Sequence, residues 1–534
     1  MYWGHITKGP FDWKFPYPSQ RMPILAQNIV STSQPLASQA GLRMILKGGN
    51  AVDAAVAAAI ALTVVEPCMN GIGSDAFAIL HDGKHLVGLN ASGKSPAAWT
   101  PGHFAQYKKM PQLGWDTVTV PGAVSAWVEL STRYGQLPFE NLFEPAIEYA
   151  KKGFLVSPII AENWKMAAGL YRGFPDFAAA FTRNGTVPKA GERFAFPALA
   201  TSLELIAKTR GTAFYHGDLA KKIVAHAEHT GGSITLEDLE NHKALWVKPI
   251  SLAYKDVTVH ELPPNGQGLA ALMMLGIAKH LDLGSYKPDS IESWHLQIEA
   301  MKLAFADTYR YVADPDSLEF PPEHLLEDNY LKQRATLIDR AMAQNPSYGT
   351  PTHGDTVYLT TADANGMMVS YIQSNFLFFG SGIVIPETGI SLQNRGSGFT
   401  LEPGHPNQVG PNKRPFHTII PAFVTRKDKP LMSFGIMGGP MQPQGHAQML
   451  IRIFEYGQNP QAASDAPRWC VTEGLHVNVE DGLKKEVIAG LTQLGHKIAK
   501  GLPVLFGGAQ LIYNLENGYL AASDHRKDGQ AVGI

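Results

Sequence analysis

The spacing of hydrophobic and polar positions changes near residue 355 of the chain. Before that point helical and extended patterns alternate, and the helical ones are the longer. A glycine pair ends the first predicted helix, and Asp53 precedes an alanine-rich second helix, where an acidic side chain suits the helix dipole. The predicted helices of this part are 36–47, 54–65, 219–228, 235–241, 268–281 and 291–311. We expect a helix-rich region built around a few strands.

After residue 355 the chain changes to short segments in which apolar and polar positions alternate, as expected for strands. The predicted strands are 356–361, 367–373, 381–385, 418–424 and 431–436, with more strands after 508 and helices at 444–456 and 483–494. Sheets covered by helices on both outer sides are the simplest packing of this mixture. The pattern therefore predicts a layered architecture.

The amino-acid composition and net charge indicate what kind of molecule the protein binds. The chain has 534 residues, of which 45% are hydrophobic and 17% charged, so it is long enough for a large layered core and is globular in composition. Its 45 basic and 47 acidic residues give a net charge of −2, which provides no electrostatic attraction for nucleic acid or an anionic membrane. A small molecule is the expected partner, and self-association into a homo-oligomer is left open.

The sequence also sets expectations for location and metal content. Its first residues lack a basic stretch followed by an apolar one, which favours a cytoplasmic protein. The longest apolar run, Ala54 to Val65, is too short to span a bilayer. The two cysteines, Cys68 and Cys470, form neither a disulfide framework nor a zinc-binding spacing. No metal site and no cofactor are predicted.

Thr356 is the leading catalytic candidate. It follows Gly354-Asp355 and opens a strand-like run, directly after a segment rich in Pro, Ser, Gly and Thr. If the Asp355-Thr356 peptide bond breaks, Thr356 gains an α-amine with a pKa of about 7.7–8.0, which can accept the proton of its own hydroxyl. One residue would then supply nucleophile and base. The alternative is a β-branched residue that simply begins a strand.

Three other positions could support such chemistry. Gly438-Gly439 precedes a predicted helix and offers two backbone amides to a developing oxyanion, although an ordinary tight turn has the same sequence. Arg395 lies in a glycine-flanked loop, where its guanidinium could clamp a substrate carboxylate or simply face solvent. His417 and His446 could be bases or ligands, but no metal-binding spacing accompanies them, so ordinary hydrogen-bonded histidines are favoured.

The segment from Gly88 to Ser95 matches the phosphate-binding pattern GxxxxGK[ST]. A working phosphate loop needs a helix that begins at the Lys-Ser pair. Pro101-Gly102 would end any such helix almost at once. A nucleotide site is therefore a minor hypothesis.

Several segments in one order resemble the γ-glutamyltranspeptidase family of N-terminal nucleophile hydrolases, over nearly the whole chain. The matching segments are 48–55, 70–73, 120–122, the Asp355-Thr356 junction, 380–383 and 438–439. The resemblance implies an α+β fold, a four-layer αββα sandwich, made from a precursor that cuts itself into residues 1–355 and 356–534. It also implies that Thr356 attacks the Asp355 carbonyl, that Gly438 and Gly439 bind the oxyanion, and that Ser374 or Asn375 lies near the nucleophile.

The departures from the family pattern bear on the substrate. Enzymes of the family that recognise a γ-glutamyl group carry an arginine where this chain reads 91–94, and an aspartate where it has Gly398. Arg395 stands in place of a neutral polar residue, and His417-Thr418 in place of paired serines. These changes indicate a substrate with a carboxylate but without the glutamyl amino group. In them the chain is similar to the branch that includes oxamate amidohydrolase and the cephalosporin acylases.

The sequence thus predicts a self-processing threonine amidohydrolase that forms an acyl-enzyme with a small carboxylate-bearing amide. Arg395, aided by Lys94, would hold the carboxylate. One alternative is a glutathione hydrolase or γ-glutamyltransferase. Another, of a different class, is an uncleaved and catalytically silent binding protein.

Overall fold

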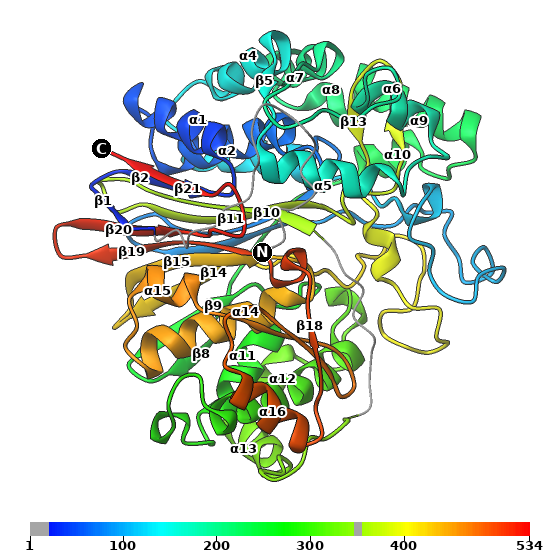
Figure 1. Ribbon diagram of the computed structural model, residues 1–534. Coiled ribbons are helices and arrows are strands. Elements are labelled where there is room, and N and C mark those ends of the chain that lie inside the picture. The colour runs from blue at the N-terminus through cyan, green and yellow to red at the C-terminus, as the bar shows by residue number, and fades with distance from the viewer. Residues whose placement is uncertain (1–20, 347–354) are drawn as a thin grey trace.

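Two stacked sheets form the middle of the molecule, in a computed structural model that describes residues 21–346 and 355–534 (Figure 1). The upper sheet of Figure 1 has the order β21 (Gln530–Gly533), β2 (Ile29–Thr32), β10 (Asp355–Ala362), β11 (Met368–Phe376), β3 (Asp75–His81), β4 (Leu86–Ala91) and β7 (Leu245–Val247). The lower sheet has the order β1 (Ile24–Ala26), β20 (Gly518–Ser523), β19 (Gly508–Leu515), β15 (Lys429–Met437), β14 (Ala422–Arg426), β9 (Val257–Glu261) and β8 (Ile250–Tyr254). Neighbouring strands are antiparallel throughout both sheets.

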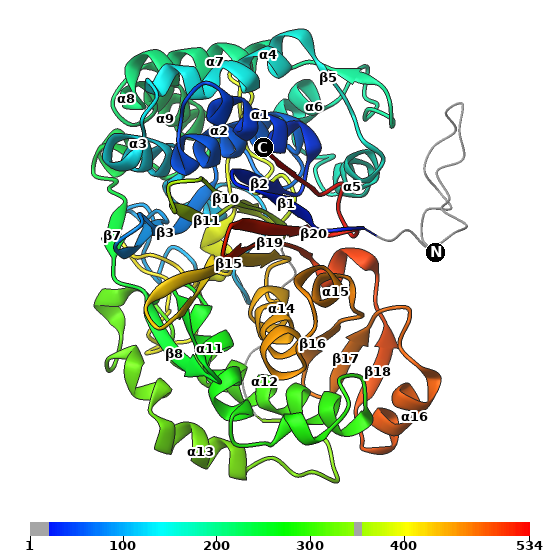
Figure 2. The ribbon, with the colours of Figure 1, turned by 90° about the vertical axis from the view of Figure 1, so that its left-hand side faces the viewer.

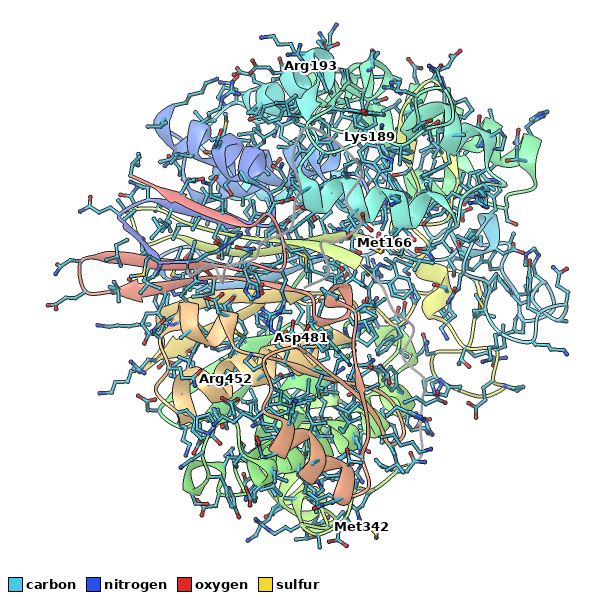
Figure 3. All side chains as sticks on the ribbon, viewed as in Figure 1. Met166, Lys189, Arg193, Met342, Arg452 and Asp481 are labelled. Atoms are coloured by element: carbon cyan, nitrogen blue, oxygen red, sulfur yellow. The ribbon has the colours of Figure 1, made fainter. Side chains whose placement is uncertain are left out.

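Helices cover the outer face of each sheet, so the described chain is a four-layer αββα sandwich (Figure 1). The upper layer contains α1 (Pro35–Leu46), α2 (Ala51–Val65), α3 (Ala123–Tyr134), α4 (Glu144–Lys152), α5 (Pro158–Ala168), α6 (Pro175–Phe181), α7 (Pro197–Thr209), α8 (Thr212–Tyr215), α9 (Asp218–Thr230) and α10 (Leu236–Glu240). The lower layer contains α11 (Gly268–Ala278), α12 (Ile291–Tyr311), α13 (Asp328–Thr336), α14 (Met441–Leu450), α15 (Pro460–Asp465) and α16 (Lys485–Gln493). Figure 2 shows a small sheet of β16 (Trp469–Glu473), β17 (His476–Val479) and β18 (Lys497–Lys500) beside α16. In Figure 3, Lys189 and Arg193 mark the upper layer, and Met342 and Arg452 the lower one.

The alanine-rich helix α2 is the centre of the upper layer. All of its residues are buried, and their small side chains let the helix lie close to β10 and to α1. It begins at Ala51, three residues before the predicted start, because Asn50 and Asp53 form a capping box. The Asn50 side chain accepts from the amides of Val52 and Asp53, and the Asp53 carboxylate accepts from the amide of Asn50.

Close contact between the two sheets places β10 directly above β15. Tyr358 of β10 is fully buried in the apolar layer between the sheets, and a Cβ on Gly435 of β15 would lie 2.3 Å from its ring. Glycine is therefore required at that position for the ring to fit. Thr360 and Ser433 also join the sheets through a hydrogen bond of 2.6 Å between their hydroxyls.

Both sheets mix strands from before and after residue 355. In the upper sheet β10, β11 and β21 come from the later part of the chain, and the other four strands from the earlier part. The lower sheet is mixed in the same way. Residues 1–355 and 356–534 therefore do not form separate compact units. Cleavage between them stays a prediction, and residues 347–354, which precede the junction, lie outside the described residues.

Most predicted elements are present, with three informative differences. Of the predicted strand 418–424, only the part from Ala422 is a strand, because residues before it bond to a neighbouring loop: the His417 amide donates to Asn265 O, and the Gln267 amide to His417 O. Of 381–385 only β12 (Val384–Ile385) forms, since Gly380 and Gly382 have positive φ angles. The predicted helix 444–456 begins at Met441 and changes to a π-helical turn at residue 451.

The phosphate-loop hypothesis is wrong. Gly88 to Ala91 belong to strand β4, and no helix begins at Lys94-Ser95. Gly93 instead permits close contact between two backbones, because a Cβ there would lie 1.5 Å from the carbonyl oxygen of Val120.

Cys68 and Cys470 are both buried and do not form a disulfide. In the part of the chain that the structure describes, no helix is long and apolar enough to cross a membrane.

Candidate active site

Thr356 lies in an irregular pair of strands at the start of β10. Asp355 pairs with Phe376 and Val357 pairs with Gln373, so Thr356 alone faces both Ser374 and Asn375 of β11. A β-bulge of this kind changes the direction in which a side chain points. The Thr356 side chain is buried, with its hydroxyl donating to Ser374 Oγ (3.2 Å) and accepting from Gln442 Nε2 (3.3 Å).

The two residues opposite Thr356 have different roles in the structure. Ser374 contacts the Thr356 hydroxyl, and its own oxygen also accepts from the amide of Phe376 (2.8 Å). The side chain of Asn375 instead accepts from Ser74 Oγ (2.8 Å) and donates to Ser391 Oγ (3.1 Å). The structure thus brings Ser374 to the candidate nucleophile, whereas Asn375 connects the loop at Ser74 to strand β13 (Ile390–Ser391).

Gly438 and Gly439 connect the end of β15 to the start of α14. Their φ angles are +117° and +57°, a region of backbone conformation that favours glycine. Both of their carbonyl oxygens accept hydrogen bonds, from the amides of Met441 and Gln442, whereas no described residue accepts from either glycine amide. In the first turn of α14, Gln442 reaches Thr356, so this helix begins next to the candidate nucleophile. The sequence analysis missed Gln442, although it lies only three residues after the glycine pair.

Arg395 is buried, with 2% of its surface exposed. Its Nη1 donates to Thr418 Oγ1 (2.7 Å), and its guanidinium lies 4.9 Å from the centre of the Phe376 ring. Its Nε and Nη2 atoms are buried and have no hydrogen-bond partner among the described residues. Burial lowers the pKa of Arg395 to about 9, against the opposing effect of the Asp75 charge, so the guanidinium remains charged at neutral pH.

A cavity of about 800 Å³ leads to Arg395. Arg395, Thr418 and Pro440 line it, and Pro440 follows Gly439 directly in sequence. Four aromatic residues, Tyr309, Phe376, Phe399 and Phe416, supply apolar surface, and the exposed side chains of Lys108 and Lys109 also line the cavity. Neither Lys94 nor His417 is among the described lining residues.

A second cavity, of about 460 Å³, is lined by Met166 and Asp481, which Figure 3 labels, and by none of the candidate residues.

His417 does not line the cavity at Arg395 and contacts an acidic residue, Asp75, that was not predicted from the sequence. Its Nε2 atom is 3.1 Å from Oδ2 of Asp75, and neither side chain is exposed. Its Nδ1 atom accepts from the amide of Ile419 (3.4 Å), so both ring nitrogens are occupied. Burial and the nearby Arg395 charge lower the pKa of His417 well below its ordinary value. His417 is therefore a neutral donor to Asp75.

His446 is also a hydrogen-bonded core histidine. Its Nδ1 is 2.7 Å from Glu261 Oε1, and its Nε2 accepts from the amide of Ile436. Elsewhere in the described residues, three side chains that could bind a metal ion lie close together: His295, Glu299 and His496. The ammonium group of Lys302 lies 2.7 Å from Glu299 Oε1, so a cation of the protein already holds that carboxylate.

Comparison with known proteins agrees with this architecture. The family model for γ-glutamyltranspeptidase matches residues 37–534. The chain is 38% identical over 521 residues to the glutathione hydrolase-like YwrD proenzyme of Bacillus subtilis, covering 95% of this chain and 98% of that protein. It is 36% identical over 515 residues to the oxamate amidohydrolase proenzyme of Klebsiella pneumoniae, covering 93% and 97%. The crystal structure of cephalosporin acylase from Bacillus halodurans superposes with a TM-score of 0.94, at 45% identity and 99% coverage of both chains.

The αββα sandwich and the match to the family model define the class of N-terminal nucleophile hydrolases, an enzyme class of amidohydrolases and peptidases. Within that class the chain belongs to the γ-glutamyltranspeptidase family. The family and fold expected from the sequence are confirmed. The names of the relatives include hydrolases of different substrates, so membership alone does not select one.

Proposed function

We propose that this protein is a self-processing threonine amidohydrolase, which cleaves an amide whose acyl part carries a carboxylate. Thr356 is the nucleophile, and Gly438 and Gly439 bind the oxyanion. Arg395 binds the substrate carboxylate. The observation that carries this proposal is the buried guanidinium of Arg395, which lines the cavity and has two N–H groups without a hydrogen-bond partner among the described residues.

Maturation would begin at the Asp355-Thr356 bond. The Thr356 hydroxyl attacks the Asp355 carbonyl carbon, and the C–N bond then breaks to leave an ester between the two residues and a free Thr356 amine. Water hydrolyses the ester and restores the hydroxyl. The hydrogen bonds from Thr356 to Ser374 and from Gln442 to Thr356 support this step, because they fix the position of the attacking oxygen.

In each catalytic cycle the new amine accepts the proton of the Thr356 hydroxyl, whose oxygen attacks the substrate carbonyl. The proton then passes to the leaving amine as the C–N bond breaks, and water releases the acid from the acyl-enzyme. The Gly438 and Gly439 amides stabilise the negative oxygen at both stages. Loss of one such donor typically lowers the rate by about 10²–10³.

The substrate is proposed from the charges that line the cavity. A carboxylate can accept from both Arg395 Nε and Nη2 in the two-point geometry that arginine favours. The residue at 398 is a glycine that lines the cavity, so no side-chain carboxylate is supplied there for a glutamyl amine. Lys94 does not line the described cavity, so the carboxylate is assigned to Arg395 without its aid. Relatives named oxamate amidohydrolase and cephalosporin acylase motivate carboxylate-bearing amides as the first substrates to test.

Glutathione hydrolysis is the second candidate, since a relative with 38% identity is named glutathione hydrolase-like. Ammonia release from oxamate and turnover of a γ-glutamyl anilide separate the two activities. We expect turnover of oxamate or a larger carboxylate-bearing amide, strongly weakened in Arg395→Gln, and little turnover of the anilide. Rapid anilide turnover by the mature protein would contradict the proposal. A single uncut band on a denaturing gel, unchanged by Thr356→Ala, would instead favour the silent binding protein.

A further inference from the structure

Asp75 is a buried acid close to the proposed carboxylate site, and the steps proposed above do not use it. It begins strand β3 and pairs with Ser374 in the antiparallel register with β11. Its Oδ1 accepts from the amide of Gly122 (3.0 Å), and its Oδ2 contacts His417 Nε2 (3.1 Å). No part of the side chain is exposed. Asp75 is thus fixed beside the residue that contacts Thr356.

Asp75 and Arg395 form a buried pair of opposite charges without touching. Among the described residues no hydrogen bond joins the two side chains. Arg395 donates to Thr418, and Asp75 contacts His417, which directly precedes Thr418 in the sequence. Each nevertheless acts on the other: the charge of Arg395 lowers the pKa of Asp75, and the charge of Asp75 raises the pKa of Arg395. When it is ionised, the carboxylate of Asp75 is therefore the internal counter-charge of Arg395.

We propose that Asp75 is a specificity-determining residue, which competes with the substrate carboxylate for the charge of Arg395 and takes up a proton when that carboxylate binds. This inference rests on the proposed function, because it requires Arg395 to hold the substrate. A second carboxylate beside Arg395 repels Asp75, and because the side chains of Asp75 and Arg395 are both buried, solvent screens this repulsion only weakly. Protonation of Asp75 removes that repulsion.

The surroundings of Asp75 make this protonation accessible near neutral pH. Burial raises the pKa of Asp75 to about 7, while Arg395, two backbone amides and the more distant Arg414 lower it. His417 is neutral, and Tyr215, whose pKa is raised by its own burial, is neutral as well. A bound carboxylate offsets the Arg395 charge and raises the pKa of Asp75 further. Affinity for the carboxylate should then fall as pH rises above about 7, because binding requires a proton.

The test uses the mature protein and oxalate, a carboxylate that has no amide bond to cleave. Isothermal titration calorimetry at pH 7.5, in two buffers with different ionisation enthalpies, measures the protons taken up per oxalate. We expect net uptake by the wild type. The dissociation constant of the wild type should rise about fivefold more than that of Asp75→Asn between pH 7 and 9, which corresponds to a shift of about one unit, from about 7 to about 8, in the pKa of Asp75. The Thr356 amine titrates in both proteins, so the comparison isolates Asp75.

A second acidic residue, away from the cavity, serves as the control. Asp528 is a half-buried acid, whose pKa burial raises to about 6, and it bonds to Ser157 away from the cavity. Asp528→Asn should keep the wild-type pH profile of oxalate binding.

Oxalate binding that depends on Arg395 but shows no proton uptake would overturn the role of Asp75 and leave the proposed function standing. Failure of oxalate to bind mature wild type would contradict the carboxylate site itself. Even if Asp75→Asn does not fold, the absence of proton uptake by the wild type would overturn the role of Asp75.

Discussion

At Thr356 a single oxygen is held between a hydrogen-bond acceptor and a donor. Ser374 accepts from it and Gln442 donates to it, so the hydroxyl hydrogen and one lone pair both have fixed directions. Burial of the side chain keeps this arrangement away from bulk water. The geometry suits a nucleophile that needs little reorganisation before attack.

Replacement of Gln442 tests the contribution of the donor. Gln442→Leu removes the hydrogen bond to Thr356 and keeps the approximate volume of the side chain. A neutral hydrogen bond contributes about 0.5–1.5 kcal/mol, so kcat of the matured variant should fall by about two- to tenfold with little change in KM. Gln448→Leu is the control, because Gln448 lies on the same helix and bonds to Gln444 and Trp469. An equal loss of kcat in both variants would contradict the assignment.

The buried charge of Asp75 has a consequence for stability. Burial raises its pKa from an ordinary 3.8 to about 7, so the folded state holds this proton more tightly than the unfolded state. Its ionisation therefore costs stability as pH rises through this range, and the full cost is present above about pH 7. Between pH 4 and 8, the free energy of unfolding of Asp75→Asn should increase relative to that of the wild type, as measured by urea denaturation. A difference that does not vary with pH would argue against this.

The ends of elements, more than their interiors, place the candidate active site. The bulge at the start of β10 directs Thr356, and the Gly438-Gly439 connection after β15 brings the first turn of α14 to it. The sequence predicts these strands and helices well because their hydrophobic periods are local, whereas the roles of Thr356 and the glycine pair are predictions that depend on the family resemblance. It could not predict the contact of Asp75 with His417, which joins residues 342 positions apart. It also could not show which of Ser374 and Asn375 faces the nucleophile, because that depends on the strand register.

Helix α12 carries a buried ion pair that stabilises the last described segment before residue 347. Lys302 donates to Glu299 and to the carbonyl oxygen of Gln344, and the Gln344 amide donates to Glu299. Both charged side chains are nearly inaccessible, with exposed fractions of 3% and 1%. The pair therefore holds the backbone at Gln344 against the helix.

Removal of the lysine should destabilise the protein strongly. Lys302→Met leaves Glu299 buried without its partner, which typically costs about 3–5 kcal/mol. The free energy of unfolding from urea denaturation measures the effect. Lys332→Met, at an exposed position of α13, is the control and should change stability by no more than about 0.5 kcal/mol. Equal stability of the two variants would show that the buried pair contributes little.

At the scale of the whole molecule, the two predicted fragments share both sheets. Strand β10 pairs with β2 from the earlier part of the chain and with β11 from the later part. Strand β3 of the earlier part pairs in turn with β11. Cleavage at residue 355 would cut the backbone and leave this hydrogen-bonded framework continuous.

Neither fragment should therefore fold alone. Residues 356–534 expressed separately would expose unpaired strand edges and the apolar faces of both sheets, so we expect aggregation or an unfolded circular dichroism spectrum. Coexpression of both fragments should restore a soluble complex that elutes as one species in size-exclusion chromatography. A cooperative thermal transition of 356–534 alone would contradict the shared-sheet account.

The central claim is that backbone cleavage creates an amino-terminal threonine that activates its own hydroxyl. Intact mass spectrometry of purified, active protein, with amino-terminal sequencing of the smaller fragment, tests it most directly. The account predicts two fragments, the smaller beginning at Thr356, and an uncleaved and inactive Thr356→Ala variant. Full activity in a continuous chain, or in Thr356→Ala, would contradict it.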